Sequence, residues 1–218
     1  NDNTQDLVIQ DQEQVLYLLN SDGEQVYNLP LSGPVISDAF QIDFFKNGKL
    51  QLLLATADQI YAIDRLGNLL PGFPLSLPEE KLTNLNLVDY EQNREYRYFV
   101  STEKGNLWLL DKTGKPLEGW NPLRLGDPVL GAPFHFRVPG KGDFMIAQGK
   151  SGMVHFFNRR GEKQPGSPLN LGKDINSPLK LTSGNSPSLT AISNGGELIN
   201  GSFSGEIQYR NQLEKSNR

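Results

Sequence analysis

An eight-residue pattern recurs along this chain of 218 residues and constrains its fold more than any other feature. In each copy a short apolar run ends on Asn or Asp, and in the first four copies a Gly follows three places later. The copies are LYLLNSDG from Leu16, IYAIDRLG from Ile60, LWLLDKTG from Leu107, VHFFNRRG from Val154 and a degraded IQYRNQLE from Ile207. Their first residues lie 44, 47, 47 and 53 positions apart. The pattern therefore indicates one structural unit used repeatedly.

The fifth place of each copy predicts a tight turn. It is occupied by Asn20, Asp64, Asp111, Asn158 and Asn211. An Asn or Asp side chain can accept a hydrogen bond from the backbone two residues further on. Glycine three places later adopts a positive φ at no steric cost. Each copy is therefore predicted to be a strand that ends in a hairpin corner.

Three further strands are expected around each corner. The segments that follow it, 71–77, 118–125 and 165–171, contain proline, which a sheet accepts only at its edge, so they predict an outer strand. The apolar segments 50–56, 96–102, 143–149 and 197–203 predict a buried strand before each corner. An innermost strand is expected at 36–45, 82–88, 129–138 and 175–181. Four antiparallel strands at this period are typical of a β-propeller blade.

The sequence thus predicts an all-β fold, a single β-propeller domain or propeller fragment of about five four-stranded antiparallel blades. The expected units are 1–34, 35–80, 81–127, 128–174 and 175–218, with three, four, four, four and three strands. The segment TSGNSPS at 182–188 is interpreted as a longer loop in the last unit. No segment has sustained helical periodicity, so few helices are expected.

The incomplete first and last units leave three arrangements open. The chain is a fragment of a larger ring of about six to eight blades, a five-bladed ring with two incomplete blades, or an open array completed by another chain. Closure through one shared blade would need terminal pieces that add up to four strands, whereas these supply six. We favour the fragment, because free sheet edges otherwise pair with any available strand.

Composition excludes several classes of function. The net charge is −4 and no run of basic residues occurs, which argues against a nucleic-acid partner. The absence of cysteine excludes disulfides, thiolate metal sites and a cysteine nucleophile. The apolar run from Leu50 to Ala57 is too short for a transmembrane segment. Residues 1–6 do not resemble a signal sequence, so any export signal is expected outside this chain.

Few residues suggest chemistry. The two histidines, His135 and His155, cannot complete a three-ligand zinc site without carboxylates, so structural roles are expected, with His135 lining the central channel as the alternative. Asp22-Gly23 and GKGD at 140–143 lack the alternating oxygen ligands of a calcium loop and predict turns. No nucleophile-elbow, phosphate-loop or zinc-protease motif occurs. We therefore expect no catalytic, cofactor-binding or metal-ligating residues.

Two surface features remain as binding candidates. NRRGEK at 158–163 is interpreted as a solvated corner, with an anion or partner contact as the alternative. Trp108 and Trp120 are expected to fill the wedge between blades. If those rings were exposed instead, they and Tyr98 would indicate a carbohydrate-binding or protein-binding surface.

The segments LLDKTGKPLEGW (109–120) and YAIDRLGNLLPGF (61–73) resemble the quinoprotein-like, PQQ-type propeller repeat. The matching residues are Asp111, Thr113, Gly114, Lys115 and Trp120, with three extra residues before the tryptophan. Phe73 and Ser167 take the tryptophan place in other units. The resemblance implies that Asp and Gly shape the turn and that Trp docks one blade on the next.

That family includes quinone-dependent dehydrogenases and non-catalytic scaffolds such as the propeller lipoprotein of the bacterial outer-membrane assembly machine. The dehydrogenases carry a vicinal cysteine pair, which this chain lacks. The resemblance alone does not choose between the two. The missing cysteine pair and the lack of a convergent set of catalytic residues favour a non-catalytic scaffold without a cofactor, which binds a protein partner. The resemblance implies a location in the bacterial periplasm or at the cell surface. Part of a quinone-dependent dehydrogenase and a carbohydrate-binding propeller are the alternatives.

Overall fold

The computed structural model describes residues 5–175, 177–184 and 186–214. These residues form five antiparallel sheets and contain no helix. The first sheet contains β1 (Leu7–Gln10), β2 (Val15–Leu19) and β3 (Gln25–Pro30), and the second contains β4 (Phe40–Ile42), β5 (Gln51–Ala55) and β6 (Ile60–Ile63). The third contains β7 (Leu82–Val88), β8 (Arg97–Thr102), β9 (Asn106–Asp111) and β10 (Leu123–Arg124).

The last two sheets also have four strands each, paired in chain order. The fourth sheet contains β11 (Phe134–Val138), β12 (Gly142–Gln148), β13 (Met153–Phe157) and β14 (Leu169–Asn170). The fifth contains β15 (Lys180–Thr182), β16 (Ser188–Ile192), β17 (Glu197–Ser202) and β18 (Ile207–Gln212). The all-β prediction is therefore confirmed.

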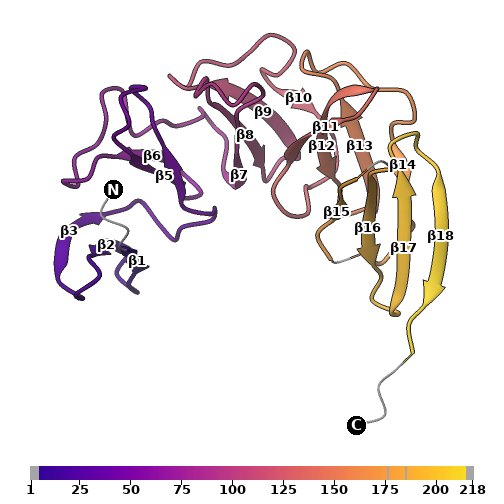
Figure 1. The fold of residues 1–218 in the computed structure, drawn as a ribbon, viewed down its shortest axis with the longest axis horizontal. Coiled ribbons are helices and arrows are strands. Elements are labelled where there is room, and N and C mark those ends of the chain that lie inside the picture. Colours follow the sequence, from indigo (N-terminus) through magenta and orange to yellow (C-terminus); the bar gives the residue numbers. More distant parts are fainter. Residues whose placement is uncertain (1–4, 176, 185, 215–218) are drawn as a thin grey trace.

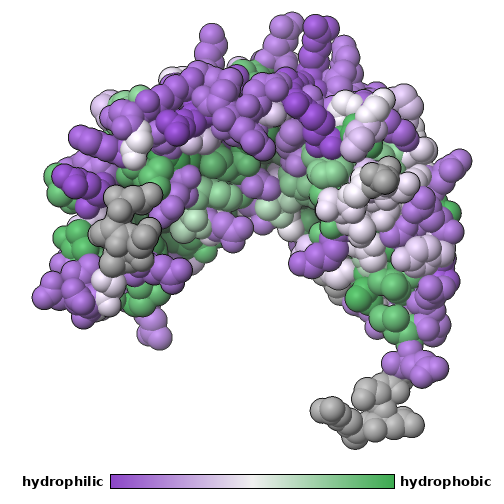
Figure 2. Space-filling view, viewed as in Figure 1, coloured by the Kyte–Doolittle hydropathy of each residue, from purple (hydrophilic) through white to green (hydrophobic). Residues whose placement is uncertain are grey.

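The five sheets stand side by side along an open arc (Figure 1). In the fifth sheet β15 lies toward the concave side of the arc and β18 along its outer side (Figure 1). Hydrophilic residues cover the outer side, whereas apolar residues gather toward the concave side (Figure 2). This order agrees with the prediction that the first strand of a unit is innermost and the last is outermost.

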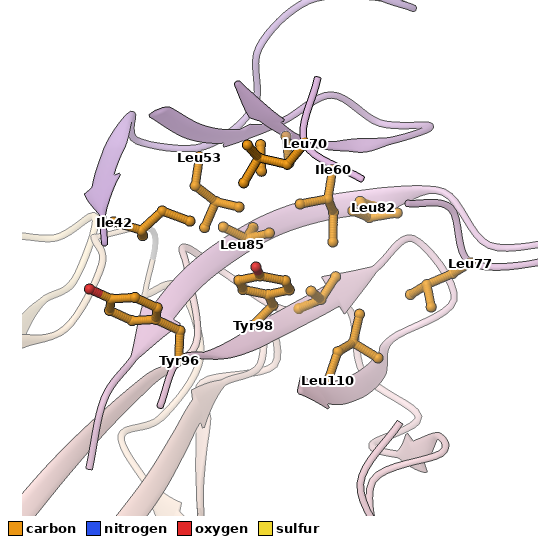
Figure 3. Close-up of a cluster of buried hydrophobic side chains, with 13 residues drawn as sticks. Ile42, Leu53, Ile60, Leu70, Leu77, Leu82, Leu85, Tyr96, Tyr98 and Leu110 are labelled. Atoms are coloured by element: carbon orange, nitrogen blue, oxygen red, sulfur yellow. The ribbon is translucent and has the colours of Figure 1, made fainter. Parts of the chain in front are cut away.

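Apolar side chains fill each seam, the interface between two consecutive sheets. Because successive residues of a strand face opposite sides of its sheet, one strand serves two seams. Tyr98 of β8 packs into the seam with the second sheet, and its neighbour Phe99 packs into the seam with the fourth. Figure 3 shows the first of these seams, where Leu53 and Ile60 of the second sheet face Leu85 of the third. Four such clusters hold the arc together.

Four of the predicted corners are confirmed by their hydrogen bonds. Oδ1 of Asp111 accepts the backbone N–H groups of Thr113 at 2.8 Å and of Lys115 at 3.0 Å. Asn20, Asp64 and Asn158 accept from the residues two and four places on in the same way. Gly114, the turn glycine of the Asp111 corner, has a positive φ of 87°, as the pattern requires.

The fifth corner was predicted at the wrong place. Asn211 lies within the outer strand β18, and the corner is formed by Ser202, nine residues earlier. Oγ of Ser202 accepts the backbone N–H groups of Ser204 at 3.2 Å and of Glu206 at 3.3 Å. The repeat copy is therefore LINGSFSG from Leu198, 44 residues after Val154. Serine replaces Asn or Asp here, which concealed the copy.

The strand counts of two sheets differ from the prediction, and the shifted corner accounts for the first of them. The fifth sheet has four strands where three were expected, because 197–203 is its third strand and β16 is its second. The segment 182–188, which was interpreted as a longer loop of the last unit, connects β15 to β16 and belongs to no other loop. In the second sheet the outer strand expected at 71–77 is reduced to one isolated bridge, Leu75 with Ile60, and a second bridge, Leu69 with Ile63, lies before that segment. The unit boundaries and membership of a larger ring stay predictions.

Candidate functional site

A cluster of charged and aromatic side chains lies at the seam between the third and fourth sheets. We call it the seam cluster, and its members are Tyr90, Glu91, His135, Arg137, Asp143 and Arg159. Two of them come from the third sheet and four from the fourth. The cluster therefore depends on how the two sheets are placed against each other.

The third sheet supplies Tyr90 and Glu91 from the hairpin between β7 and β8. The carboxylate of Asp89 shapes this hairpin, because it accepts the backbone N–H groups of Asn93 at 3.1 Å and of Arg94 at 2.8 Å. Arg94 itself has a positive φ of 65°, which tightens the turn. A short polar hairpin thus holds an aromatic ring and a carboxylate beside the next sheet.

The fourth sheet supplies the other members through strand register. Arg137 of β11 is paired directly with Asp143 of β12, and His135 lies two residues before Arg137 on the same face. Arg159 follows the corner residue Asn158. Strand alternation therefore brings His135, Arg137 and Asp143 to the hairpin that carries Glu91, and the corner at Asn158 brings Arg159 there.

The four charged groups form a closed ring of alternating sign. Arg137 lies 3.0 Å from Glu91 through Nη2 and 2.9 Å from Asp143 through Nε. Arg159 lies 2.6 Å from Glu91 through Nη2 and 2.8 Å from Asp143 through Nε. The last contact is ionic only, because the Nε–H of Arg159 has no hydrogen-bond acceptor within the described residues. Each arginine thus joins the two sheets.

Burial and hydrogen bonding set the charges at the centre of the cluster. Burial lowers the pKa of His135 and outweighs the opposite influence of Asp143, whose Oδ1 lies 2.8 Å from Nε2 of the imidazole. Burial alone would raise the pKa of Asp143, but the hydrogen bonds to Arg137 and His135 hold it below its usual value. At neutral pH the histidine is therefore neutral and the carboxylate charged.

Aromatic contacts fix Arg159 and His135. The Arg159 guanidinium lies 4.1 Å from the centroid of the Tyr90 ring, a cation–π geometry, and His135 meets the same ring edge-to-face at 4.9 Å. Burial raises the pKa of Tyr90 to about 12, so its hydroxyl stays protonated. The main-chain carbonyl of Arg159 accepts the indole N–H of Trp120 at 2.9 Å. The guanidinium is therefore held from several sides.

The outer part of the cluster is open to solvent. The side chains of Arg137 and Glu91 are 50% and 51% exposed, whereas that of Asp143 is only 16% exposed. A shallow pocket of about 250 Å³ adjoins them, lined by Asp143, Asn158, Arg159, Arg160, Glu162 and Gln164. The arrangement can exchange ion pairs with an approaching charged group while its inner half stays fixed. Its chemistry is that of ionic recognition.

NRRGEK was interpreted as a solvated corner, and this is correct for one of its two arginines. Arg160 is exposed, but Arg159 belongs to the seam cluster. GKGD forms the predicted turn, with φ = 74° at Gly140 and 88° at Gly142, yet its Asp143 joins the cluster, which the sequence reasoning missed. The register of this hairpin, which pairs Val138 with Gly142, would have placed Asp143 opposite Arg137.

The remaining candidates are structural. The ring of His155 lies in β13, stacks on Phe157 at 6.2 Å and has a pKa lowered by burial. Trp120 is fully buried in the seam between the third and fourth sheets, and Trp108 is partly buried in the seam before it. Tyr98 is also fully buried. Trp120 and Tyr98 therefore offer no surface for carbohydrate binding, because packing between sheets covers them, whereas the ring of Trp108 is only partly covered.

Two other expectations concern metals and membranes. Asp22 and Gly23 lie in the first corner turn, where Asn20 accepts the N–H of Asp22. Within the described residues no group of three or more His, Asp and Glu side chains is placed to hold a metal ion. In the same part of the chain no helix has the length and hydropathy needed to cross a membrane.

Comparison with solved structures decides the fold. BamB from Moraxella catarrhalis superimposes with a TM-score of 0.63 at 16% identity, over 96% of this chain and 61% of that one. BBS1N, solved in complex with ARL6DN, superimposes with a TM-score of 0.68 at 17% identity, over 97% of this chain and 62% of that one. Both are propellers. The fold is a β-propeller.

The sheets are therefore propeller blades, and the prediction of a β-propeller is confirmed. A protein of unknown function from Bacteroides caccae also superimposes, with a TM-score of 0.57 at 13% identity, over 96% of this chain and 73% of that one. The chain spans about three fifths of the length of BBS1N and BamB. No protein-family model and no curated protein sequence matches this propeller.

Proposed function

We propose that this propeller is a non-catalytic interaction module that binds a protein partner through the seam cluster. The observation that carries the proposal is the ring of alternating charge formed by Glu91, Arg137, Asp143 and Arg159, half of which is open to solvent. BBS1N, which has the same fold, was solved in a complex with ARL6DN, and this supports a role in protein assembly.

The geometry suits recognition for three reasons. The guanidinium groups are already oriented by Asp143 and Tyr90, so binding costs less conformational entropy than for free side chains. A guanidinium can hold a partner carboxylate with two parallel hydrogen bonds. Exposed Glu91 offers the opposite charge beside it, so a partner must present both signs in the correct order. The cluster therefore contributes specificity as well as affinity.

Site-specific photo-crosslinking tests the partner contact. A photoreactive amino acid at Arg160, which lines the pocket beside the cluster, should give one crosslinked protein identified by mass spectrometry. The matched control is the same amino acid at Lys150, an exposed turn residue at the other end of β12, and it should not give this product. Glu91→Gln combined with Arg137→Gln should abolish the crosslink. Equal crosslinking with intact or neutralised charges would contradict the proposal.

The non-catalytic part has a separate test. The purified full-length protein should carry no quinone and should not reduce an electron-acceptor dye with alcohols or sugars. A bound quinone together with turnover would replace the interaction module by a dehydrogenase.

We further propose an extracytoplasmic location in a bacterial envelope. The similarity to BamB of Moraxella catarrhalis supports it, together with the quinoprotein-like corner at Asp111. Fractionation of the native cells should place the protein with periplasmic or membrane markers. Recovery with cytoplasmic markers alone would reject the location and leave the partner contact untouched.

A further inference from the structure

A second pocket lies on the opposite face of the propeller, at the seam between the second and third blades. It has a volume of about 530 Å³ and is lined by Asp58, Gln59, Ser76, Leu77, Pro78, Glu79, Glu80 and Lys81. The turn between β5 and β6 and the connection that precedes β7 form its walls. Strand β7 begins beside this pocket at Leu82 and ends at Val88, before the hairpin of the seam cluster. The two sites are therefore at opposite ends of the strands.

Glu80 gives this pocket an unsatisfied acceptor. Its side chain is only 7% exposed. Oε1 accepts a hydrogen bond from Nδ2 of Asn106 at 2.7 Å and lies 4.0 Å from Nζ of Lys104. Oε2 is buried and has no hydrogen-bond partner among the described residues. Buried carboxylate oxygens are normally paired, so a free one indicates a place for a donor.

The charges around Glu80 favour a cationic donor. Asp58 and Glu79 add two carboxylates to the lining. Lys81 pairs with Asp58 at the rim, where both side chains are about half exposed, and Lys104 donates to the main-chain carbonyl of Glu79. Three carboxylates against two ammonium groups leave the pocket with a net negative charge.

We propose that this pocket binds the guanidinium group of an arginine side chain on a protein partner. A guanidinium has five N–H donors and no acceptor, so it can donate hydrogen bonds to Glu80 and Asp58 at the same time. An ammonium group is a compact point charge and is less suited to this. Leu77 and Pro78 provide an apolar wall for the methylene groups of the arginine. Binding requires Oε2 of Glu80 to turn toward the arriving guanidinium, and the terminal torsion of a glutamate side chain is soft enough to allow this. The inference goes beyond the seam cluster and shares no residue with it.

Nuclear magnetic resonance of the full chain tests the proposal with N-acetyl-arginine amide as the probe. At low ionic strength the probe should cause saturable shifts of the backbone amides of Asp58 and of the pocket residues that carry an N–H, namely Ser76, Leu77, Glu79, Glu80 and Lys81. Two matched probes, N-acetyl-citrulline amide and N-acetyl-lysine amide, should bind at least tenfold more weakly. Citrulline keeps the shape without the charge, and lysine keeps the charge without the planar fork.

Two substitutions of opposite effect complete the test. Glu80→Gln should weaken binding at least tenfold, since it removes the charge but keeps an oxygen for Asn106. Lys81→Met should strengthen binding several-fold, since it removes the cation that competes for Asp58. Asp58→Asn replaces Glu80→Gln if the latter does not fold. Glu118→Gln, which neutralises an exposed carboxylate outside the pocket, should leave the binding of all three probes unchanged. Equal binding of the three probes, or weaker binding after Lys81→Met, would overturn the proposal.

Discussion

Trp120 donates its indole N–H to the main-chain carbonyl of Arg159 at 2.9 Å and thereby links the third blade to the fourth. The same indole lies edge-to-face against Phe99 at 5.3 Å and Phe157 at 5.7 Å, one ring from each blade. One side chain thus fills the seam and fixes the backbone that carries a guanidinium of the seam cluster. Packing and recognition share this residue.

Substitution of the two tryptophans by phenylalanine should have unequal effects. Trp120→Phe removes a buried hydrogen bond, leaves the Arg159 carbonyl unpaired and creates a cavity, so it should lower the free energy of unfolding by about 2–4 kcal/mol. Trp108→Phe should cost roughly 1 kcal/mol, since its indole N–H has no partner within the described residues and only ring area is lost. Urea denaturation of both variants measures the difference, and equal losses would contradict it.

Two glycines with similar φ, each in the turn that follows a corner, should differ in their tolerance of alanine. Gly119 has φ = 82°, and a Cβ there would lie 2.0 Å from the main-chain oxygen of Arg160. Gly119→Ala should therefore cost at least about 3 kcal/mol. Gly72, in the preceding blade, has φ = 88° with no atom near its Cβ position, so Gly72→Ala should cost only about 1–2 kcal/mol. Thermal unfolding ranks the variants, and a more harmful Gly72→Ala would refute the packing argument.

Stability should decrease as the pH falls from 7 to 5. Burial lowers the pKa of both His135 and His155 below 6.5, so the unfolded chain binds protons that the folded chain resists. The loss begins near 6.5 and continues downward to the folded-state values. Asp143, with its pKa below 3.8, keeps its contribution throughout this range and loses it only in stronger acid. Urea midpoints at pH 7, 6 and 5 provide the measurement.

Glutamine substitutions assign that pH dependence. His135→Gln and His155→Gln should each flatten the curve between pH 7 and 5, and the double variant should be nearly flat there. A double variant with the slope of the unmodified protein would place the titrating groups elsewhere.

The fifth corner should be improved by the residue that the other corners use. Ser202→Asp replaces a hydroxyl that accepts at 3.2 and 3.3 Å by a carboxylate, which accepts at 2.8 and 3.0 Å in the Asp111 corner. The gain should be about 0.5–1 kcal/mol in chemical denaturation. Asn211→Ser is the matched control, since Asn211 lies in β18 and forms no corner. It should leave stability unchanged, and a loss there would restore the original repeat assignment.

The corners show how far the sequence determines the fold. Asp111 and Gly114 specify their turn locally, so spacing and residue type were enough to predict strand, corner and blade period. The corner at Ser202 was not predicted because the pattern requires Asn or Asp, whereas a serine hydroxyl accepts the same two hydrogen bonds. The outer strand predicted at 71–77 in the second blade is absent, since within that segment Leu75 alone makes an isolated bridge.

The candidate sites depend on longer-range geometry. Glu91 and Arg159 are 68 residues apart and meet only because two blades stand at a fixed seam. Likewise, the free oxygen of Glu80 follows from the position of Asn106, 26 residues further on. Neither relationship is encoded in a local motif. The sequence offered only the alternative of a partner contact at NRRGEK, which contains Arg159, and it did not indicate the pocket of Glu80.

Each apolar cluster joins two consecutive blades, which makes the described arc a nearest-neighbour system. The stability of the first blade is coupled to that of the fifth only through the three blades between them. A defect in the third blade would therefore uncouple the two blades on its N-terminal side from the two on its C-terminal side, and the cooperativity of the array is limited by its weakest seam. Trp120 packs in the seam between the third and fourth blades. This single side chain therefore helps determine whether the arc unfolds as one cooperative unit or as two.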